Sequence, residues 1–159
     1  MRRWWLSLLL LACVASARGA DTTTVAAAAD LTFALGEIAA TYERDTGNRI
    51  RISFGSSGNL ARQIPQGAPV DLFLAADEED IFRLAAQGFL RDRGRLYAIG
   101  RLALLAPHGS PLPVDGELQG LAAALADGRL QRLAIANPEH APYGRAARAA
   151  LERAEIGRA

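Results

Sequence analysis

Two adjacent serines flanked by glycines, Gly55–Gly58, are the residues of this chain best suited to bind an anion. They follow Ile50–Phe54, an alternating segment typical of a half-buried strand, and they precede Leu60 and Ile64, whose spacing indicates a helix from Asn59 onward. A turn that opens a helix leaves backbone N–H groups unpaired beside the positive end of the helix dipole. The two hydroxyls add donors, so the stretch predicts an oxyanion site. Taken alone, the stretch is better explained by a serine that only caps the helix.

A serine hydrolase is the alternative chemistry for the same turn. Ser56 or Ser57 would be the nucleophile, and His108 or His140 would be the base. The turn is not the Gly-x-Ser-x-Gly elbow of hydrolases, and His140 is typical of a loop histidine, so we expect no enzyme activity. Arg62, in the first turns of the following helix, either contacts the anion or lies on the solvated face.

Composition narrows the function further. The 159 residues carry 18 basic and 17 acidic side chains, and this near balance of charge argues against a basic surface for nucleic acid. Every basic residue is Arg. One cysteine and two histidines exclude disulfides and argue against a metal site built from these residues. The chain is long enough for one ordinary domain or two very small lobes.

The first twenty residues are predicted to be a signal peptide. Arg2 and Arg3 precede an apolar run that is too short to span a bilayer, and small residues follow it. Cys13 raises the alternative of a lipoprotein, but Leu11 fits poorly two places before a lipidated cysteine. We therefore expect soluble export to the periplasm.

The elements that must position the serine turn alternate between strands and helices. Leu31, Leu35, Ile38 and Tyr42 lie at helical spacing and predict one buried face, and Gly47 is expected to end that helix. The expected strands are Thr22–Ala28, Ile50–Phe54 and Val70–Leu74, and the expected helices are Leu31–Thr46, Asn59–Ile64 and Glu78–Gln87, the last capped by Asp77. This order predicts an α/β fold with a doubly wound parallel sheet, with Val70–Leu74 in the middle of the sheet. Ligands of such sheets bind outside the carboxyl ends of the strands, where the serine turn lies.

The second half of the chain predicts a further α/β unit. Two strands are expected at Leu102–Ala106 and Leu133–Ala136, with a helix at Leu118–Ala126 between them. A third strand-to-helix turn, Asn137–Gly144, leads into an expected helix at Arg145–Ala154.

Four blocks together resemble the periplasmic molybdate-binding protein family. They are Ala26–Thr32, Phe54–Ile64, Gly67–Asp77 and Asn137–Gly144, and they match in order and roughly in spacing. The resemblance implies a two-lobed periplasmic binding protein fold of type II, with crossing strands between the lobes and the oxyanion in the cleft. It implies a receptor for molybdate or tungstate, with no further cofactor, which acts as a monomer and delivers the anion to the membrane permease of an ABC importer.

The same resemblance assigns the site residues. Ser57 matches a serine whose hydroxyl and backbone amide contact the anion, and Tyr143 matches a position that contributes a backbone amide from the second lobe. Asp30 stands where many members have Ser or Asn, and we expect its carboxylate to cap the helix at Leu31 while its backbone N–H reaches the ligand. Ser56 is a further candidate ligand and shapes the turn with its flanking glycines.

The resemblance also implies a division of the chain. Residues 1–20 would be the signal peptide, residues 21–98 the first lobe, and residues 99–159 part of a second lobe. Because family members continue beyond the matched blocks, the first lobe is expected to be mostly present and the second incomplete. The alternatives left open are a receptor for another oxyanion, such as phosphate or sulfate, and a fragment that does not bind.

Overall fold

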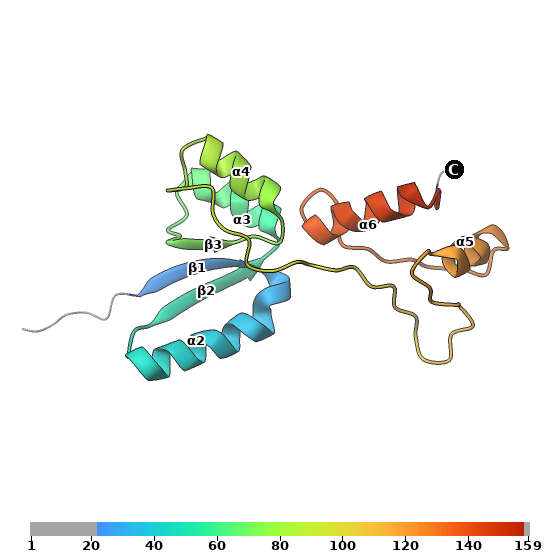
Figure 1. Cartoon of the computed structure of the whole chain (residues 1–159), viewed down its shortest axis with the longest axis horizontal. Coiled ribbons are helices and arrows are strands. Elements are labelled where there is room, and N and C mark those ends of the chain that lie inside the picture. Colours follow the sequence, from blue (N-terminus) through green and yellow to red (C-terminus); the bar gives the residue numbers. More distant parts are fainter. Residues whose placement is uncertain (1–21, 158–159) are drawn as a thin grey trace, which may run out of the picture.

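The computed structural model describes residues 22–157 (Figure 1). The predicted signal peptide, including Cys13, lies outside these residues. Within residues 22–157, no helix combines the length and the apolar character that a membrane span requires. Below, residues 22–98 are called the N-terminal part and residues 99–157 the C-terminal part.

The N-terminal part contains a parallel three-stranded sheet. Its strands are β1 (Thr23–Ala28), β2 (Ile50–Gly55) and β3 (Leu72–Leu74), in the order β2-β1-β3. Val25 lies opposite Ile52 on one side and Leu72 on the other. The parallel α/β arrangement is therefore as predicted, but the position of Val70–Leu74 is not. Among the described strands β1 is central and β3 is at the edge.

The central strand is made of small side chains. Ala26, Ala27 and Ala28 are each at most 2% exposed, and Val25 is 3% exposed. A strand with neighbours on both edges and helices on both faces is buried on both sides, and β1 is buried from Val25 to Ala28. The alanines of this segment therefore suit the middle of the sheet, because small side chains let the helices approach closely.

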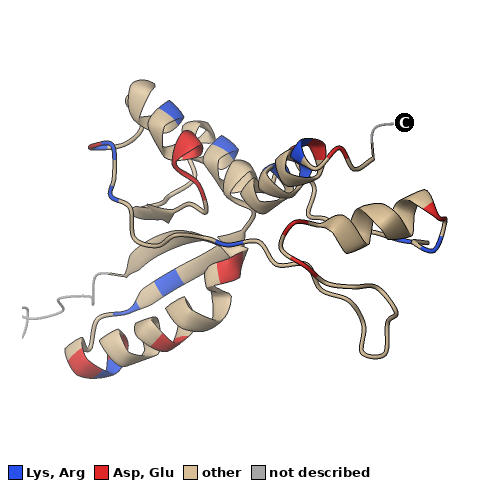
Figure 2. Ribbon diagram, turned by 45° about the vertical axis from the view of Figure 1, so that its right-hand side comes forward, with Lys and Arg blue, Asp and Glu red and all other residues tan. Residues whose placement is uncertain are grey.

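Helices pack on both sides of the sheet, with α2 on one side and α3 and α4 on the other (Figure 1). A short 3-10 turn, η1 (Ala29–Leu31), leads into α2 (Thr32–Thr46), which ends at Gly47 with a φ of 71°, as predicted. The other helices are α3 (Ser57–Gln63), which runs into a 3-10 turn, η2 (Ile64–Gln66), and α4 (Glu78–Ala86). Acidic residues gather in the first turn of α4, where the helix dipole favours negative charge (Figure 2).

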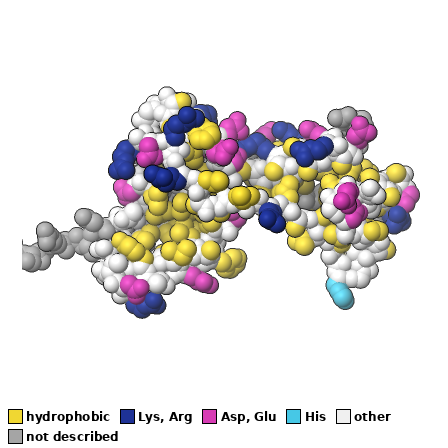
Figure 3. Space-filling view, viewed as in Figure 1, with side chains coloured by type: hydrophobic (Ala, Val, Ile, Leu, Met, Phe, Trp, Pro, Cys, Tyr) yellow, Lys and Arg dark blue, Asp and Glu magenta, His cyan; other side chains and the backbone are white. Residues whose placement is uncertain are grey.

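The predicted apolar face of α2 is only partly buried. Leu31 and Leu35 are half-buried, but Ile38 is 61% exposed and Tyr42 is 42% exposed. Figure 3 shows hydrophobic side chains gathered in the region between α2 and the helices on the other side of the sheet. The periodicity identified the helix correctly, but the described residues do not cover its whole apolar face.

The C-terminal part contains two helices, α5 (Gln119–Ala126) and α6 (Pro142–Arg153), and no strand within residues 99–157. The strands predicted at Leu102–Ala106 and Leu133–Ala136 are therefore not formed. A strand needs a neighbouring strand for its backbone N–H and C=O groups, and these segments have none in the described chain. Between them and helices α5 and α6 lies an apolar cavity of about 730 Å³.

Candidate anion-binding site

The turn between β2 and α3 places two serine hydroxyls in the protein interior. Helix α3 begins at Ser57, two residues before the predicted start at Asn59, and the Ser56 carbonyl accepts bonds from the N–H groups of Asn59 and Leu60 at 3.0 and 3.1 Å. The Ser56 side chain does not cap the helix. Its Oγ is buried and has no hydrogen-bond partner in the part of the chain that the structure describes. A buried hydroxyl without a partner is uncommon, because its lost hydration is not replaced.

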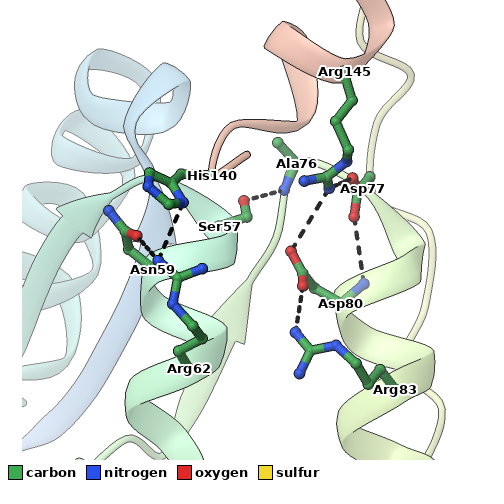
Figure 4. Close-up of polar contacts among 9 residues, drawn as sticks. All are labelled: Ser57, Asn59, Arg62, Ala76, Asp77, Asp80, Arg83, His140 and Arg145. Atoms are coloured by element: carbon green, nitrogen blue, oxygen red, sulfur yellow. Dashed lines mark hydrogen bonds and ion pairs between the residues drawn. The ribbon is translucent and has the colours of Figure 1, made fainter. Parts of the chain in front are cut away.

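Ser57 is completely buried, with 0% of its surface exposed. Its Oγ accepts a hydrogen bond of 2.9 Å from the backbone N–H of Ala76, which follows β3 (Figure 4). This bond ties the start of α3 to the end of the neighbouring strand. Because it uses a lone pair of the hydroxyl oxygen, the hydroxyl proton remains available for donation to an acceptor.

Asp30 does not cap the helix that follows it, so that expectation was wrong. Leu31 occupies the N-cap position of α2 without a side-chain bond, and Thr32 Oγ1 instead donates to the Ala29 carbonyl at 2.6 Å. The Asp30 carboxylate accepts a bond of 3.3 Å from the hydroxyl of Tyr143. Two predicted site residues, 113 positions apart, therefore meet through their side chains.

Two tyrosines near Asp30 keep their protons more firmly than ordinary tyrosines do. Burial raises the pKa of Tyr143, and the charge of Asp30 raises it further. Burial also raises the pKa of Tyr97, again with a contribution from Asp30. The Tyr97 hydroxyl donates to the Ala75 carbonyl at 2.8 Å. Both phenols are therefore neutral hydrogen-bond donors at the pH of any ordinary environment.

The loop before α6 contacts the first turn of α3. The Gly58 N–H donates to the His140 carbonyl at 3.1 Å, and the Arg62 guanidinium lies 3.3 Å from Nδ1 of His140. Arg62 also pairs with the side chain of Asn59 and is exposed, in keeping with a position on the solvated face (Figure 4). Within residues 22–157, neither serine of the turn forms a hydrogen bond with His108 or His140, so the pair required by a serine hydrolase is not assembled.

Helix α6 begins at Pro142, three residues before its predicted start at Arg145. Proline is well suited to this first position because its missing N–H would have no partner in the helix. The earlier start places Tyr143 and Gly144 in the first turn. A Cβ at Gly144 would lie 2.3 Å from the Ala136 carbonyl oxygen, so only glycine allows this close approach.

Sequence reasoning missed an ion-pair group beside this turn. Arg145 contacts Asp77 and lies 3.9 Å from Asp80, and Arg83 binds Asp80 at 2.6 Å (Figure 4). Nothing in the local pattern indicates the contacts of Arg145, because 68 positions separate it from Asp77, whereas the i,i+3 spacing of Asp80 and Arg83 on α4 is a local signal. The capping of α4 by Asp77 was predicted correctly, and Asp77 Oδ1 accepts from the Asp80 N–H at 3.4 Å.

The predicted site lies where three turns meet. The turn after β1 carries Asp30, the turn after β2 carries Ser56 and Ser57, and the first turn of α6 carries Tyr143. The apolar cavity of the C-terminal part is lined by none of these residues. Within residues 22–157, no three His, Cys, Asp or Glu side chains are grouped as metal ligands. The arrangement offers hydroxyl donors and one carboxylate at the carboxyl ends of the strands.

Comparison with known proteins identifies the family. The model of a family described as bacterial extracellular solute-binding protein matches residues 23–159. This chain belongs to that family. The membership agrees with the α/β fold of the N-terminal part.

Several relatives of this solute-binding protein are molybdate-binding proteins named ModA. The protein of Azotobacter vinelandii is 40% identical over 139 residues, which are 87% of this chain and 52% of the relative. The protein of Escherichia coli K12 is 34% identical over 163 residues, or 96% of this chain and 62% of the relative. The chain thus spans about half to three fifths of the length of these relatives. A solved structure of the Azotobacter vinelandii periplasmic molybdate-binding protein aligns over 42% of this chain and 29% of its own, at 36% identity and a TM-score of 0.41.

Proposed function

We propose that this solute-binding protein binds molybdate or tungstate in the periplasm and delivers the anion to the membrane permease of an ABC importer. The observation that carries the proposal is the 40% identity with a molybdate-binding protein over 87% of this chain. The serine turn supports it, because Ser56 and Ser57 supply hydroxyls at a place where solute-binding α/β proteins take their ligands. The protein would act by binding alone, as a monomer and not as an enzyme.

Neutral donors would hold the anion. In this proposal the hydroxyl of Ser57, the hydroxyl of Ser56 and the backbone amides of Ser57, Asp30 and Tyr143 surround the oxyanion. A tetrahedral dianion needs several convergent donors, and hydrogen bonds to a charged acceptor are roughly twice as strong as neutral ones. The proton of the Ser57 hydroxyl is free to be donated, since the Ala76 N–H occupies a lone pair of Oγ. An anion beside Ser56 would satisfy a hydroxyl that has no partner in the described chain.

The donors come from both parts of the chain, so the ligand would hold those parts together. We propose that residues 21–98 and residues 99–159 act as two lobes with the anion between them. An anion that contacts both lobes binds the closed arrangement better than the open one, and it therefore shifts the population toward closure. The permease would then recognise the closed, loaded form.

A phosphate receptor is the second candidate, and Asp30 favours it. A carboxylate is a hydrogen-bond acceptor, so it suits an oxyanion that carries a proton and repels one that does not. Hydrogen phosphate carries a proton near neutral pH, whereas molybdate and sulfate do not. The Tyr143 hydroxyl donates to Asp30 at 3.3 Å and so offsets part of this repulsion, and the identity with a molybdate-binding protein places molybdate first.

Calorimetric titration of the chain with molybdate, tungstate, phosphate and sulfate tests the proposal. We expect molybdate and tungstate to bind with similar affinity and sulfate to bind weakly. Ser57→Ala should weaken molybdate binding by about 1–3 kcal/mol, or roughly 5- to 150-fold, because a buried charged acceptor loses a donor. Ser53→Ala, an exposed serine on β2, is the matched control and should bind like the wild type. Binding of phosphate alone would replace the first candidate by the second.

A further inference from the structure

Arg145 links the two parts of the chain through a partly buried ion-pair group. Its guanidinium, on α6, pairs with Asp77 and lies 3.9 Å from Oδ2 of Asp80, both at the start of α4 (Figure 4). The Asp80 side chain is 9% exposed, and those of Arg145 and Asp77 are 31% and 27% exposed. Ion pairs shielded from water in this way are screened less by salt than surface pairs are.

The carboxylates are positioned before Arg145 reaches them. Asp77 Oδ1 accepts the N–H of Asp80 as the cap of α4, so its Oδ2 points toward Arg145. Asp80 Oδ1 binds Arg83 at 2.6 Å, whereas its Oδ2 is buried without a hydrogen bond in the described chain, with Arg145 as the nearby positive charge. Removal of Arg145 would leave two carboxylates with one arginine, and a buried charge without its partner is strongly unfavourable.

This ion-pair group adjoins the segments that carry or position the proposed anion donors. Arg145 is two residues after Tyr143 on α6, and Asp77 directly follows Ala76, whose N–H fixes the hydroxyl of Ser57. Further contacts join the two parts, namely the side-chain bond between Asp30 and Tyr143, the side-chain contact between Arg62 and His140, and the backbone bond between Gly58 and His140. Of these crossing contacts, the one made by Arg145 joins full opposite charges with restricted access to water.

We propose that Arg145 is a positioning residue that holds α6 against α4 and so maintains the closed arrangement of the two parts. Its effect on anion affinity rests on the proposed function, whereas its effect on closure does not. A protein whose competent state is only partly populated binds its ligand more weakly by that fraction. Loss of Arg145 would therefore weaken anion binding without removing any ligand contact.

The closure itself is tested without ligand. Cys13→Ser removes the sole cysteine, and Glu37→Cys on α2 and Gln131→Cys after α5 place one spin label on an exposed position of each part. We expect Arg145→Met to add longer distances between the labels in pulsed electron resonance. Arg148→Met is the control, because Arg148 lies on the same helix and, within residues 22–157, forms an ion pair only with Glu152, four residues further along, at 3.8 Å. Equal distributions for wild type and Arg145→Met would overturn the proposal.

A second variant distinguishes an Arg145 that maintains closure from an Arg145 that contacts the anion directly. Asp77→Asn retains a side chain that can cap α4 but removes the charge that holds Arg145. If Arg145 acts through closure, Asp77→Asn adds longer distances between the labels and raises the dissociation constant for molybdate about tenfold, as does Arg145→Met. If Arg145 instead contacts the anion, Asp77→Asn binds it more tightly, because a negative charge is removed, and the proposal is overturned. Asp77→Asn also replaces Arg145→Met if that variant does not fold.

The two proposals can fail separately. If none of the four oxyanions binds the wild type while both variants open the structure, the positioning role of Arg145 stands and the proposed function is wrong. If molybdate binds with equal affinity to the wild type, Arg145→Met and Asp77→Asn, the proposed function stands and the positioning role of Arg145 is wrong.

Discussion

The backbone N–H of Gly58 donates to the carbonyl oxygen of His140 at 3.1 Å, and a Cβ at Gly58 would lie 2.7 Å from that oxygen. The residues are far apart in the chain but form the contact at which the turn after β2 meets the loop before α6. The absence of a side chain at Gly58 is therefore a requirement of tertiary packing and not of the local turn, since only glycine leaves room for the carbonyl.

Gly58→Ala should destabilise the protein by about 1–3 kcal/mol, the usual cost of inserting a carbon into a packed interior. Gly36→Ala, on α2, is the matched control because a Cβ there meets nothing within 4 Å. The control should be neutral or gain up to about 1 kcal/mol from the better helix propensity of alanine. Urea unfolding followed by circular dichroism measures both. Equal stability of the two variants would show that the loop before α6 does not approach Gly58 closely in solution.

The two serines of the turn should differ in their effect on stability without ligand. Ser57→Ala leaves the Ala76 N–H without its acceptor and should lower the free energy of unfolding by about 1–3 kcal/mol. Ser56→Ala removes a buried hydroxyl that has no partner in the described chain, so stability should be unchanged or slightly higher. The same urea experiment distinguishes them. A larger loss for Ser56→Ala than for Ser57→Ala would contradict the assigned contacts.

Stability should fall at alkaline pH because of Tyr97 and Tyr143. The folded protein raises the pKa of both phenols, so the native state binds their protons more tightly than the unfolded state does. Their contribution is therefore fully present below the ordinary tyrosine pKa of about 10 and is lost as the pH rises through the folded values. Urea midpoints at a series of pH values from 8 to 11 measure this loss. Tyr97→Phe with Tyr143→Phe should flatten the alkaline decrease; an unchanged decrease would assign it to other groups.

Molybdate should stabilise the folded chain against heat. At about a hundredfold excess over its dissociation constant, a ligand that binds only the native state adds about 2.7 kcal/mol. Circular dichroism is the suitable probe because the two tryptophans, Trp4 and Trp5, lie in the predicted signal peptide. Sulfate at the same concentration is the control and should leave the midpoint nearly unchanged. A cooperative transition that no oxyanion shifts would argue against the proposed function.

Local signals predicted the regular elements of the N-terminal part well. Glycine at position 47 ended α2, and Asp77 capped α4, because both effects depend on residues within one turn. Asp30 was misassigned for the opposite reason: its partner, Tyr143, lies 113 residues away. A short polar side chain before a helix usually caps it, and no local pattern distinguishes that use from a contact with a distant phenol.

The sequence by itself determined the alternation of strands and helices, the parallel sheet and the position of the serine turn at its carboxyl edge. Those features follow from hydrophobic periodicity, turn chemistry and the handedness of crossover connections. Only the tertiary structure decided that β1 is central among the described strands, that Leu102–Ala106 and Leu133–Ala136 have no strand partner within residues 22–157, and that Arg145 reaches Asp77 and Asp80. The physical reason is that strand pairing, ion pairs and close backbone approach each require a second segment. Its position is set by the packing of the whole chain and not by the residues beside it.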